Sequence, residues 1–197
     1  MLRKGETRTT MLKFLLLGRP GSGKTFVARD MWRALPNPEE RIAVDSAWLH
    51  HGAGFPPSPW TVPFRAPHYT VSQWGLVGSR SERRLYLGEA SLSHGGCLFL
   101  DELPEFRRVA IQHLSEVLRK QYCMLGAVRL PAAPALVVAT ANLCDCGPTP
   151  RGCKCAPGEL ENYWARLNQF TELLELETVH LSGRSTFEPE YAVRRGA

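Results

Sequence analysis

The feature that most constrains the fold of this chain is a glycine-rich loop placed directly after a short apolar run. Residues 18–25 read Gly-Arg-Pro-Gly-Ser-Gly-Lys-Thr, and residues 14–17 before them are all apolar. A buried strand that ends in such a loop and leads into a helix is the geometry that holds a nucleoside triphosphate and Mg²⁺. Because the sequence predicts a strand at 13–17 and a helix at 25–35, the context argues against a chance match.

Each residue type in the loop has a physical role in phosphate binding. Gly21 and Gly23 let the backbone bend so that successive N–H groups point at one anion. Lys24 supplies a positive charge for the β and γ phosphates, Thr25 supplies a hydroxyl to Mg²⁺, and the helix adds its positive N-terminal end. The residues expected to contact the nucleotide are Gly18, Pro20, Gly21, Ser22, Gly23, Lys24 and Thr25.

Composition is that of a globular protein with one good-sized core. The chain has 197 residues, of which 44% are hydrophobic and 22% charged, and a formal net charge of +5. It carries neither an apolar stretch of membrane-spanning length nor a signal-peptide pattern, so we expect a cytoplasmic protein without a membrane partner. The mild positive charge permits an acidic partner such as nucleic acid. We expect a flexible basic arm at 1–10, one domain at 11–182 and a flexible tail at 183–197.

Predicted strands and helices alternate along the chain, which favours an α/β fold with a parallel sheet and a nucleotide at the carboxyl ends of the strands. Strands are predicted at 13–17, 62–66, 97–100, 135–140 and 173–181. Helices are predicted at 25–35 and at 106–120, and another is predicted to begin after Asn37, with Asn37 as its cap and Pro38 at its first position. In the helix at 106–120 the side chains expected to point largely inward are Val109, Ile111, Leu114, Val117 and Leu118. Residues 74–93 are predicted to insert a hairpin into a helical region, and 122–130 to form a hairpin turning at Gly126.

A pair of acids follows the apolar run at 97–100. Asp101 and Glu102 would be costly at this position unless they emerge at a cation site. We interpret Asp101 as the residue that holds the water shell of Mg²⁺ and Glu102 as the one that polarises the attacking water. The alternative is an acidic helix cap before Pro104. Asn142 follows the next predicted strand and either orients the attacking water or simply favours a turn. Glu102, Lys24 and Asn142 are the candidate catalytic residues.

Two further clusters carry chemistry. Four of the six cysteines crowd into one Gly/Pro-rich loop at 143–156, where they form either a structural zinc site with four thiolates or a set of unmetallated or redox-active thiols. Three arginines near Tyr86 could grip a phosphate backbone and a base, or could be solvated loop charges. The residues in question are Cys144, Cys146, Cys153 and Cys155, and Arg80, Arg83 and Arg84, with Arg129 as a further candidate.

Four segments, in order, carry a resemblance to a known family. They are Pro-Phe-Arg-Ala-Pro-His-Tyr-Thr at 63–70, Gly-Glu-Ala-Ser-Leu-Ser-His-Gly at 88–95, Leu-Phe-Leu-Asp-Glu-Leu-Pro-Glu-Phe at 98–106, and Asn142 leading into Cys-x-Cys-Gly at 144–147. Over about residues 11–180 the chain resembles the magnesium-chelatase-like AAA+ ATPases, most closely the ComM/YifB type. We interpret His68 and His94 within these segments as core or hydrogen-bonding residues, not metal ligands.

The resemblance implies a P-loop AAA+ core with helices on both faces of the sheet, a helix-2 insert and a pre-sensor hairpin. Such proteins are usually hexameric rings that use ATP to remodel a substrate, and the ComM type resembles ring helicases that drive DNA branch migration in recombination and natural transformation. Carried over, Lys24 and Thr25 contact phosphate and Mg²⁺, Asp101 and Glu102 are the metal and catalytic pair, and Asn142 is the sensor. The insert at 74–93 would face the ring pore.

The chain departs from the family pattern where the pattern has an arginine that reaches the neighbouring subunit's γ phosphate. Residues 170–176 read Phe-Thr-Glu-Leu-Leu-Glu-Leu, which puts Leu173 or Leu174 at that position. Arg166 lies nearby, but its position does not match. Nothing corresponds to the helical lid or to the large N-terminal domain of ComM-type proteins. Two other functions therefore stay open: a nucleotide-binding switch or partner subunit of a full-length relative, and a metal-chelatase-type subunit.

Overall fold

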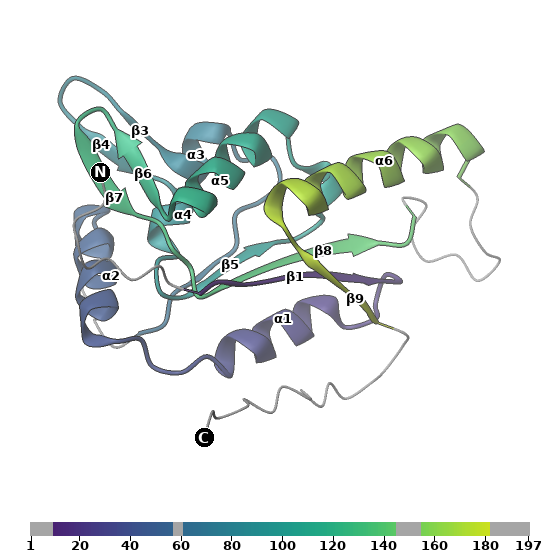
Figure 1. Cartoon of the computed structure of the whole chain (residues 1–197), viewed down its shortest axis with the longest axis horizontal. Coiled ribbons are helices and arrows are strands. Elements are labelled where there is room, and N and C mark those ends of the chain that lie inside the picture. Colours follow the sequence, from purple (N-terminus) through teal and green to yellow (C-terminus); the bar gives the residue numbers. More distant parts are fainter. Residues whose placement is uncertain (1–9, 57–60, 145–154, 182–197) are drawn as a thin grey trace.

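A five-stranded parallel sheet forms the centre of the structure, a computed structural model that describes residues 10–56, 61–144 and 155–181 (Figure 1). The strand order is β2-β5-β8-β1-β9, so the first strand lies between two strands that come late in the chain. The strands are β1 (Leu12–Gly18), β2 (Phe64–Arg65), β5 (Cys97–Leu100), β8 (Leu136–Asn142) and β9 (Glu177–Leu181). The predicted α/β fold with a parallel sheet is confirmed.

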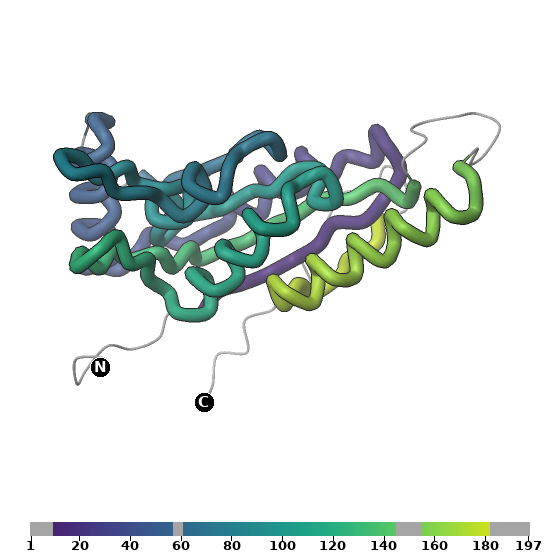
Figure 2. The backbone as a smooth tube through the Cα atoms, turned by 90° about the horizontal axis from the view of Figure 1, so that it is seen from above, coloured from purple at the N-terminus to yellow at the C-terminus, as the bar shows by residue number. Residues whose placement is uncertain are grey.

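Helices cover both faces of this sheet (Figures 1 and 2). On one face, α1 (Lys24–Arg33) packs on a cluster that includes Phe14 and Leu16 of β1, which we call the α1-side cluster. On the other face, α5 (Arg108–Lys120) and α6 (Pro157–Leu174) pack on a cluster that includes Leu15 and Leu17. Alternate side chains of β1 thus enter different cores, which explains its continuous apolar sequence.

Two small antiparallel hairpins lie side by side at one end of the molecule (Figure 1). β3 (Gly78–Arg80) and β4 (Leu85–Leu87) stand between the short helices α3 (Gln73–Val77) and α4 (Glu89–Leu92), which confirms the predicted hairpin within a helical region. β6 (Tyr122–Leu125) and β7 (Val128–Pro131) form the second predicted hairpin. It turns at Gly126, whose φ of 66° favours glycine.

The segments at 63–70 and 88–95 are joined in space. Arg65 donates two hydrogen bonds to the Glu89 carboxylate, at 2.6 Å from Nε and 2.8 Å from Nη2, and ties β2 to α4. His94 is buried, and its Nδ1 accepts a hydrogen bond from the backbone N–H of Ala133 at 3.2 Å. His68 is exposed, and its Nδ1 lies 2.9 Å from Thr70 Oγ1. Both histidines therefore serve in local hydrogen bonding.

Several predicted boundaries are wrong. The second helix, α2 (Glu40–Gly52), begins after Glu39 in an extended conformation, so Asn37 is not its cap. α5 begins at Arg108, and Val109 in its first turn is 48% exposed instead of inward. Phe106 is predicted within this helix but lies before it, fully buried just after η1 (Leu103–Glu105), a short 3-10 turn.

The last predicted strand at 173–181 begins too early. Residues up to Leu174 belong to α6, a helix of 18 residues that the sequence analysis did not assign. Its apolar stripe of Leu167, Phe170 and Leu174 has helical spacing and faces the core. The chain turns at Glu175, with a φ of 57°, before β9 begins.

The arm at 1–10, apart from Thr10, and the tail at 183–197 lie outside the described residues. Within the described part of the chain, no helix combines the length and the apolar character needed to cross a membrane.

Candidate nucleotide-binding site

The carboxyl ends of β1, β5 and β8 bring the candidate residues to one edge of the sheet. In the parallel pairing of β1 with β8, Gly18 lies opposite Asn142. In the pairing of β5 with β8, Leu100 lies opposite Ala139, so Asp101, the first residue after β5, lies beside Thr140, which is still within β8. The register alone thus assembles residues far apart in the sequence.

The loop after β1 has a conformation that requires its glycines. Gly21 and Gly23 have φ values of 76° and 86°, in the left-handed region that favours glycine. At Gly18 a Cβ atom would lie 2.6 Å from Ser22 Oγ and 2.9 Å from the carbonyl oxygen of Leu181, so this position is closed to any side chain. Next to Gly21 and Gly23 a Cβ would meet nothing within 4 Å, so the loop faces open space.

The start of α1 suits an anion. Gly23 is the N-cap of α1, and the first helical turn receives no side-chain capping hydrogen bond. Its N–H groups therefore point outward with the positive end of the helix dipole. Ser22 Oγ is buried and has no hydrogen-bond partner among the described residues. Thr25 is exposed in the first turn. These groups fit a phosphate chain with its Mg²⁺: the N–H groups and the Ser22 hydroxyl can donate to phosphate oxygens, and the Thr25 hydroxyl can bind the metal ion.

Lys24 points across the loop. Its Nζ donates to the carbonyl oxygens of Gly18 at 3.1 Å and Arg19 at 3.0 Å, and to Oδ1 of Asn142 at 2.9 Å. Burial lowers the pKa of the Lys24 ammonium below its usual value, and the charges of Asp101 and Glu102 oppose that shift in part. The lysine therefore lies between the loop and the acidic pair, where its charge can reach both a phosphate and the Asn142 side-chain amide.

The acid pair leaves β5 with both side chains exposed. Asp101 accepts a hydrogen bond from the Thr140 hydroxyl at 2.5 Å, and the Glu102 N–H donates to the same hydroxyl oxygen at 3.0 Å. Glu102 has φ 57° and ψ 54°, a left-handed conformation that is uncommon for glutamate. Although its backbone is the N-cap of η1, its side chain makes no capping hydrogen bond, which argues against the helix-cap interpretation.

Asn142 is the last residue of β8, and a residue of α6 hydrogen-bonds to its backbone. The Tyr163 hydroxyl donates to the Asn142 carbonyl oxygen at 2.8 Å and accepts its N–H at 3.1 Å. Asn142 does not have a positive φ, so a left-handed turn is not the reason for an asparagine here. Its side chain instead accepts from Lys24.

Thr140 and Tyr163 were not singled out from the sequence. Thr140 had a usable signal, because it is a single hydroxyl residue within the otherwise apolar run 136–141. Tyr163 had none, because α6 was not predicted.

The candidate cysteines follow the end of β8, and two of the four lie outside the described residues. Cys144 and Cys155 flank residues 145–154, and Cys146 and Cys153 lie outside the described residues. Within the described residues no group of three or more His, Cys, Asp or Glu is arranged to hold a metal ion.

Leu174 at the end of α6 is buried, and Leu173 is partly buried against the same core.

Arg166 is engaged within its own subunit. Its Nη2 donates to the Phe106 carbonyl oxygen at 2.6 Å, and its guanidinium lies 5.5 Å from the centre of the Phe170 ring. Arg166 is therefore directed by these contacts toward Phe106 and Phe170 of its own chain, and the end of α6 carries leucines where the family pattern has an arginine.

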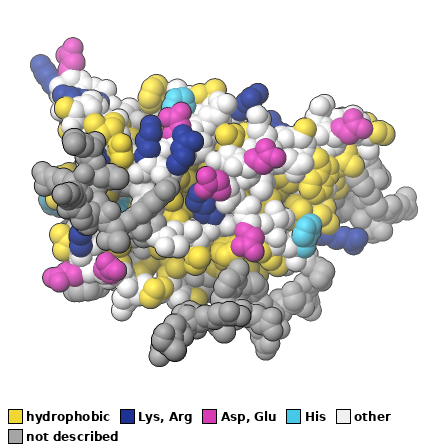
Figure 3. Space-filling view, in the orientation of Figure 1, with side chains coloured by type: hydrophobic (Ala, Val, Ile, Leu, Met, Phe, Trp, Pro, Cys, Tyr) yellow, Lys and Arg dark blue, Asp and Glu magenta, His cyan; other side chains and the backbone are white. Residues whose placement is uncertain are grey.

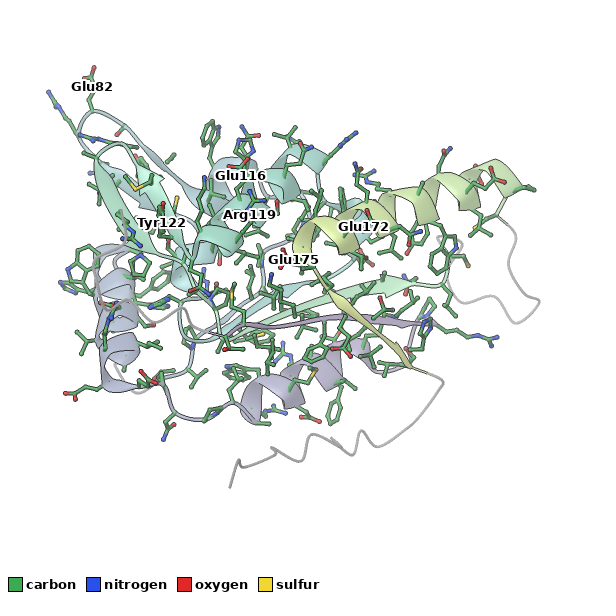
Figure 4. All side chains as sticks on the ribbon, in the orientation of Figure 1. Glu82, Glu116, Arg119, Tyr122, Glu172 and Glu175 are labelled. Carbon is green, nitrogen blue, oxygen red and sulfur yellow. The ribbon has the colours of Figure 1, made fainter. Side chains whose placement is uncertain are left out.

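The three arginines lie on the β3–β4 hairpin, at the opposite end of the molecule from the loop after β1 (Figures 1 and 2). Arg80, Arg83 and Arg84 are exposed, and Tyr86 beside them is 52% exposed. Figure 4 shows Glu82 projecting at the tip of this hairpin, and Figure 3 shows Lys or Arg side chains at the same corner.

Comparison with known proteins places this geometry in context. The family described as magnesium chelatase, subunit ChlI, matches residues 9–179. The uncharacterized protein YifB of Escherichia coli is 34% identical over 167 residues, which cover 78% of this chain and 31% of YifB. The competence protein ComM of Haemophilus influenzae is 32% identical over 169 residues, which cover 78% of this chain and 31% of ComM. The chain thus spans about a third of the length of these relatives.

Solved structures of AAA+ P-loop ATPases share the fold. NtrX from Brucella abortus in complex with ATP superimposes with a TM-score of 0.54 at 20% identity, covering 88% of this chain and 33% of NtrX. A full-length MCM homologue from Methanopyrus kandleri gives a TM-score of 0.50 at 16% identity, covering 86% of this chain and 30% of that one. The expected AAA+ core is confirmed as a fold.

The double hydrogen bond between Tyr163 and Asn142 leads to a stability prediction. Tyr163→Phe should lower the free energy of unfolding by about 1 kcal/mol, because it leaves the backbone N–H and carbonyl of Asn142 without their partner. Urea denaturation at constant m-value measures this change. Tyr86→Phe, at an exposed position, is the matched control and should be neutral. Equal stability of the Tyr163→Phe and native proteins would contradict the prediction.

Proposed function

The chain belongs to the magnesium chelatase subunit ChlI family, and we propose that within it the chain is the ATP-binding core of a ComM-like ATPase. The observation that carries this proposal is the meeting of Lys24, Asn142 and the acid pair around an open glycine loop at one edge of the sheet. NtrX, which shares the fold, has been solved with both ADP and ATP.

Each side chain of the site has a task in ATP hydrolysis that its position supports. The loop N–H groups and Lys24 bind the β and γ phosphates, and Thr25 and Asp101 are the residues that would hold Mg²⁺, directly or through its water shell. Mg²⁺ would supply positive charge that offsets the charge developing on the phosphates. Glu102 accepts a proton from the attacking water, and Asn142 orients that water or reports the γ phosphate to Lys24.

We further propose that the whole assembly is an oligomeric ring that acts on DNA, in branch migration, recombination or the processing of incoming DNA. The relative from Haemophilus influenzae is named a competence protein. Arg80, Arg83, Arg84 and Tyr86 are all exposed on the β3–β4 hairpin, and arginines with a nearby aromatic ring are the residue types that bind a phosphate backbone and a base.

A second function has its own observation in its favour. The end of α6 carries buried Leu174, and Arg166 donates to a carbonyl oxygen of its own chain. Without an arginine there, a neighbouring copy of this chain would give no charge to the γ phosphate, and such a charge can be worth about 10³–10⁵ in rate. The alternative is therefore a nucleotide-binding switch or partner subunit whose turnover depends on a full-length relative. A metal-chelatase-type subunit shares the same pocket.

The ATP site is tested by two substitutions with opposite expectations. Lys24→Ala should weaken binding of MgATP by about 10- to 100-fold, because it removes a charged hydrogen-bond donor to phosphate. Glu102→Gln should bind ATP within about 2-fold of the native protein but lower phosphate release by about 100-fold or more, because it removes the proton acceptor. Isothermal titration and a phosphate-release assay measure the two effects.

Lys120→Ala, at an exposed position on α5, is the control for loss of a lysine. A native chain that binds no ATP would overturn the proposal. A native chain that binds ATP and releases phosphate only after a full-length relative is added would select the partner-subunit function.

The hairpin surface predicts a salt-dependent loss of DNA binding. Replacing Arg80, Arg83 and Arg84 by Ala should weaken binding of single-stranded or forked DNA at low salt. The slope of log affinity against log salt should become shallower by about 2 to 3, as expected for three lost phosphate contacts. Fluorescence anisotropy over a salt series measures both quantities.

The control for charge removes the same number of cations elsewhere, by alanine at Arg33, Arg119 and Lys120. If that variant loses as much affinity as the hairpin variant, the effect is one of net charge and the hairpin is not the DNA surface. A native protein without affinity for DNA at low salt would remove the DNA part of the proposal.

We propose that Cys144, Cys146, Cys153 and Cys155 hold a structural zinc ion, since thiolate ligands select this metal and the segment has little apolar sequence to pack. The purified chain should contain about one zinc per molecule. Cys144→Ser should abolish retention of zinc, whereas Cys97→Ala, in buried β5, should leave it intact. Elemental analysis after exhaustive dialysis measures the content, and a metal-free native protein would rule out the zinc site.

A further inference from the structure

We infer that Thr140 is a positioning residue for the acid pair: its hydroxyl fixes the direction of the Asp101 carboxylate and the backbone of Glu102, and so sets the Mg²⁺ requirement of the site. This inference rests on the proposed ATP site. Thr140 faces the acids from the neighbouring strand, and its two side-chain hydrogen bonds go to Asp101 and Glu102.

The sheet register explains why a hydroxyl stands at this place. Leu136 and Val138 of β8 point into the α1-side cluster, and side chains two residues apart in a strand share a face, so Thr140 points to the same side. Asp101 continues β5 on that side after Phe99. At 1% exposure, Thr140 is enclosed. An apolar residue of the same shape would fill the space equally well, so packing does not explain the hydroxyl.

The two hydrogen bonds have only one possible direction each. The backbone N–H of Glu102 can only donate, so Thr140 Oγ1 accepts it at 3.0 Å. The single hydroxyl proton is then left for Oδ1 of Asp101, at 2.5 Å. One hydroxyl therefore ties two consecutive residues together through a side chain and a backbone group.

The consequence is a fixed orientation of both acids. With Oδ1 of Asp101 held, the carboxylate cannot rotate freely, and its other oxygen stays directed away from Thr140. The Glu102 backbone is in a left-handed conformation that is unfavourable for a residue with a Cβ, and the hydrogen bond of its N–H to Thr140 helps to hold it there. Partners of this kind that orient ligands typically change metal affinity by about 10- to 100-fold when removed.

The test separates ATP binding from its dependence on Mg²⁺. We would titrate a fluorescent ATP analogue in EDTA and over a Mg²⁺ series. Thr140→Val keeps the shape and removes the hydroxyl, so affinity in EDTA should stay within about 2-fold while the Mg²⁺ concentration for half-maximal effect rises about 10- to 100-fold. Thr140→Ser keeps the hydroxyl and should stay within about 3-fold of the native protein. Thr178→Val, at an exposed position of β9, is the control.

A double-mutant cycle with Asp101→Asn tests whether the hydroxyl acts through the acid. Once Asp101 is neutralised, Thr140→Val should add little, because residues that act as one unit are non-additive. Circular dichroism and urea denaturation check folding, and Thr140→Ala is the substitute if Thr140→Val does not fold.

The outcomes distinguish the inference from the proposal beneath it. A native protein that responds to Mg²⁺ while Thr140→Val responds equally overturns the inference and leaves the ATP site standing. A Thr140→Ser protein as impaired as Thr140→Val also overturns it, because the hydroxyl would not be the cause. A native protein that binds no ATP overturns both.

Discussion

The parallel pairing of β1 with β8 is the constraint on which the rest of the structure depends. It sets Gly18 opposite Asn142, and it can form only if residues more than a hundred positions apart meet in the middle of the sheet. The pairing is favourable because β1 buries alternate side chains in two different cores. The glycine loop, the Asn142 side chain and the two acids then occupy neighbouring positions because parallel strands all end at the same edge.

A second interaction, the bidentate ion pair of Arg65 and Glu89, joins strand β2 to helix α4 at the base of the β3–β4 hairpin. Its geometry, with both carboxylate oxygens engaged, is the strong form of a charged hydrogen bond. Gly96 lies so close to Pro63 that a Cβ on Gly96 would overlap the proline. This close approach allows β2, which follows Pro63, to pair with β5, which follows Gly96. The β3–β4 hairpin thus extends from a part of the fold that is held by the Arg65–Glu89 ion pair and by the close packing of Gly96 on Pro63.

The sequence predicted those parts of the molecule whose local pattern and tertiary role agree. Strands β1, β5 and β8 are largely apolar runs that end at glycine, acid or asparagine residues, and the second hairpin has a clear turn residue in Gly126. The prediction failed at α6, where the alternation of leucine and acid near its end looked like a strand although Leu167, Phe170 and Leu174 have helical spacing. The prediction also missed Thr140 and Tyr163. The single hydroxyl within the apolar run 136–141 marks Thr140 as unusual, but its partners depend on strand register, and the role of Tyr163 depends on the packing of α6.

The hydroxyl of Tyr163 has a consequence for the cysteine-bearing segment that starts just after Asn142. It holds the end of β8 against the second turn of α6, so the chain leaves and re-enters the folded core at anchored points on either side of residues 145–154. Closing a loop costs conformational entropy whether or not a ligand is present. Here the folded core bears that cost, so Cys144 and Cys155, which flank residues 145–154, start with a raised effective concentration for one another.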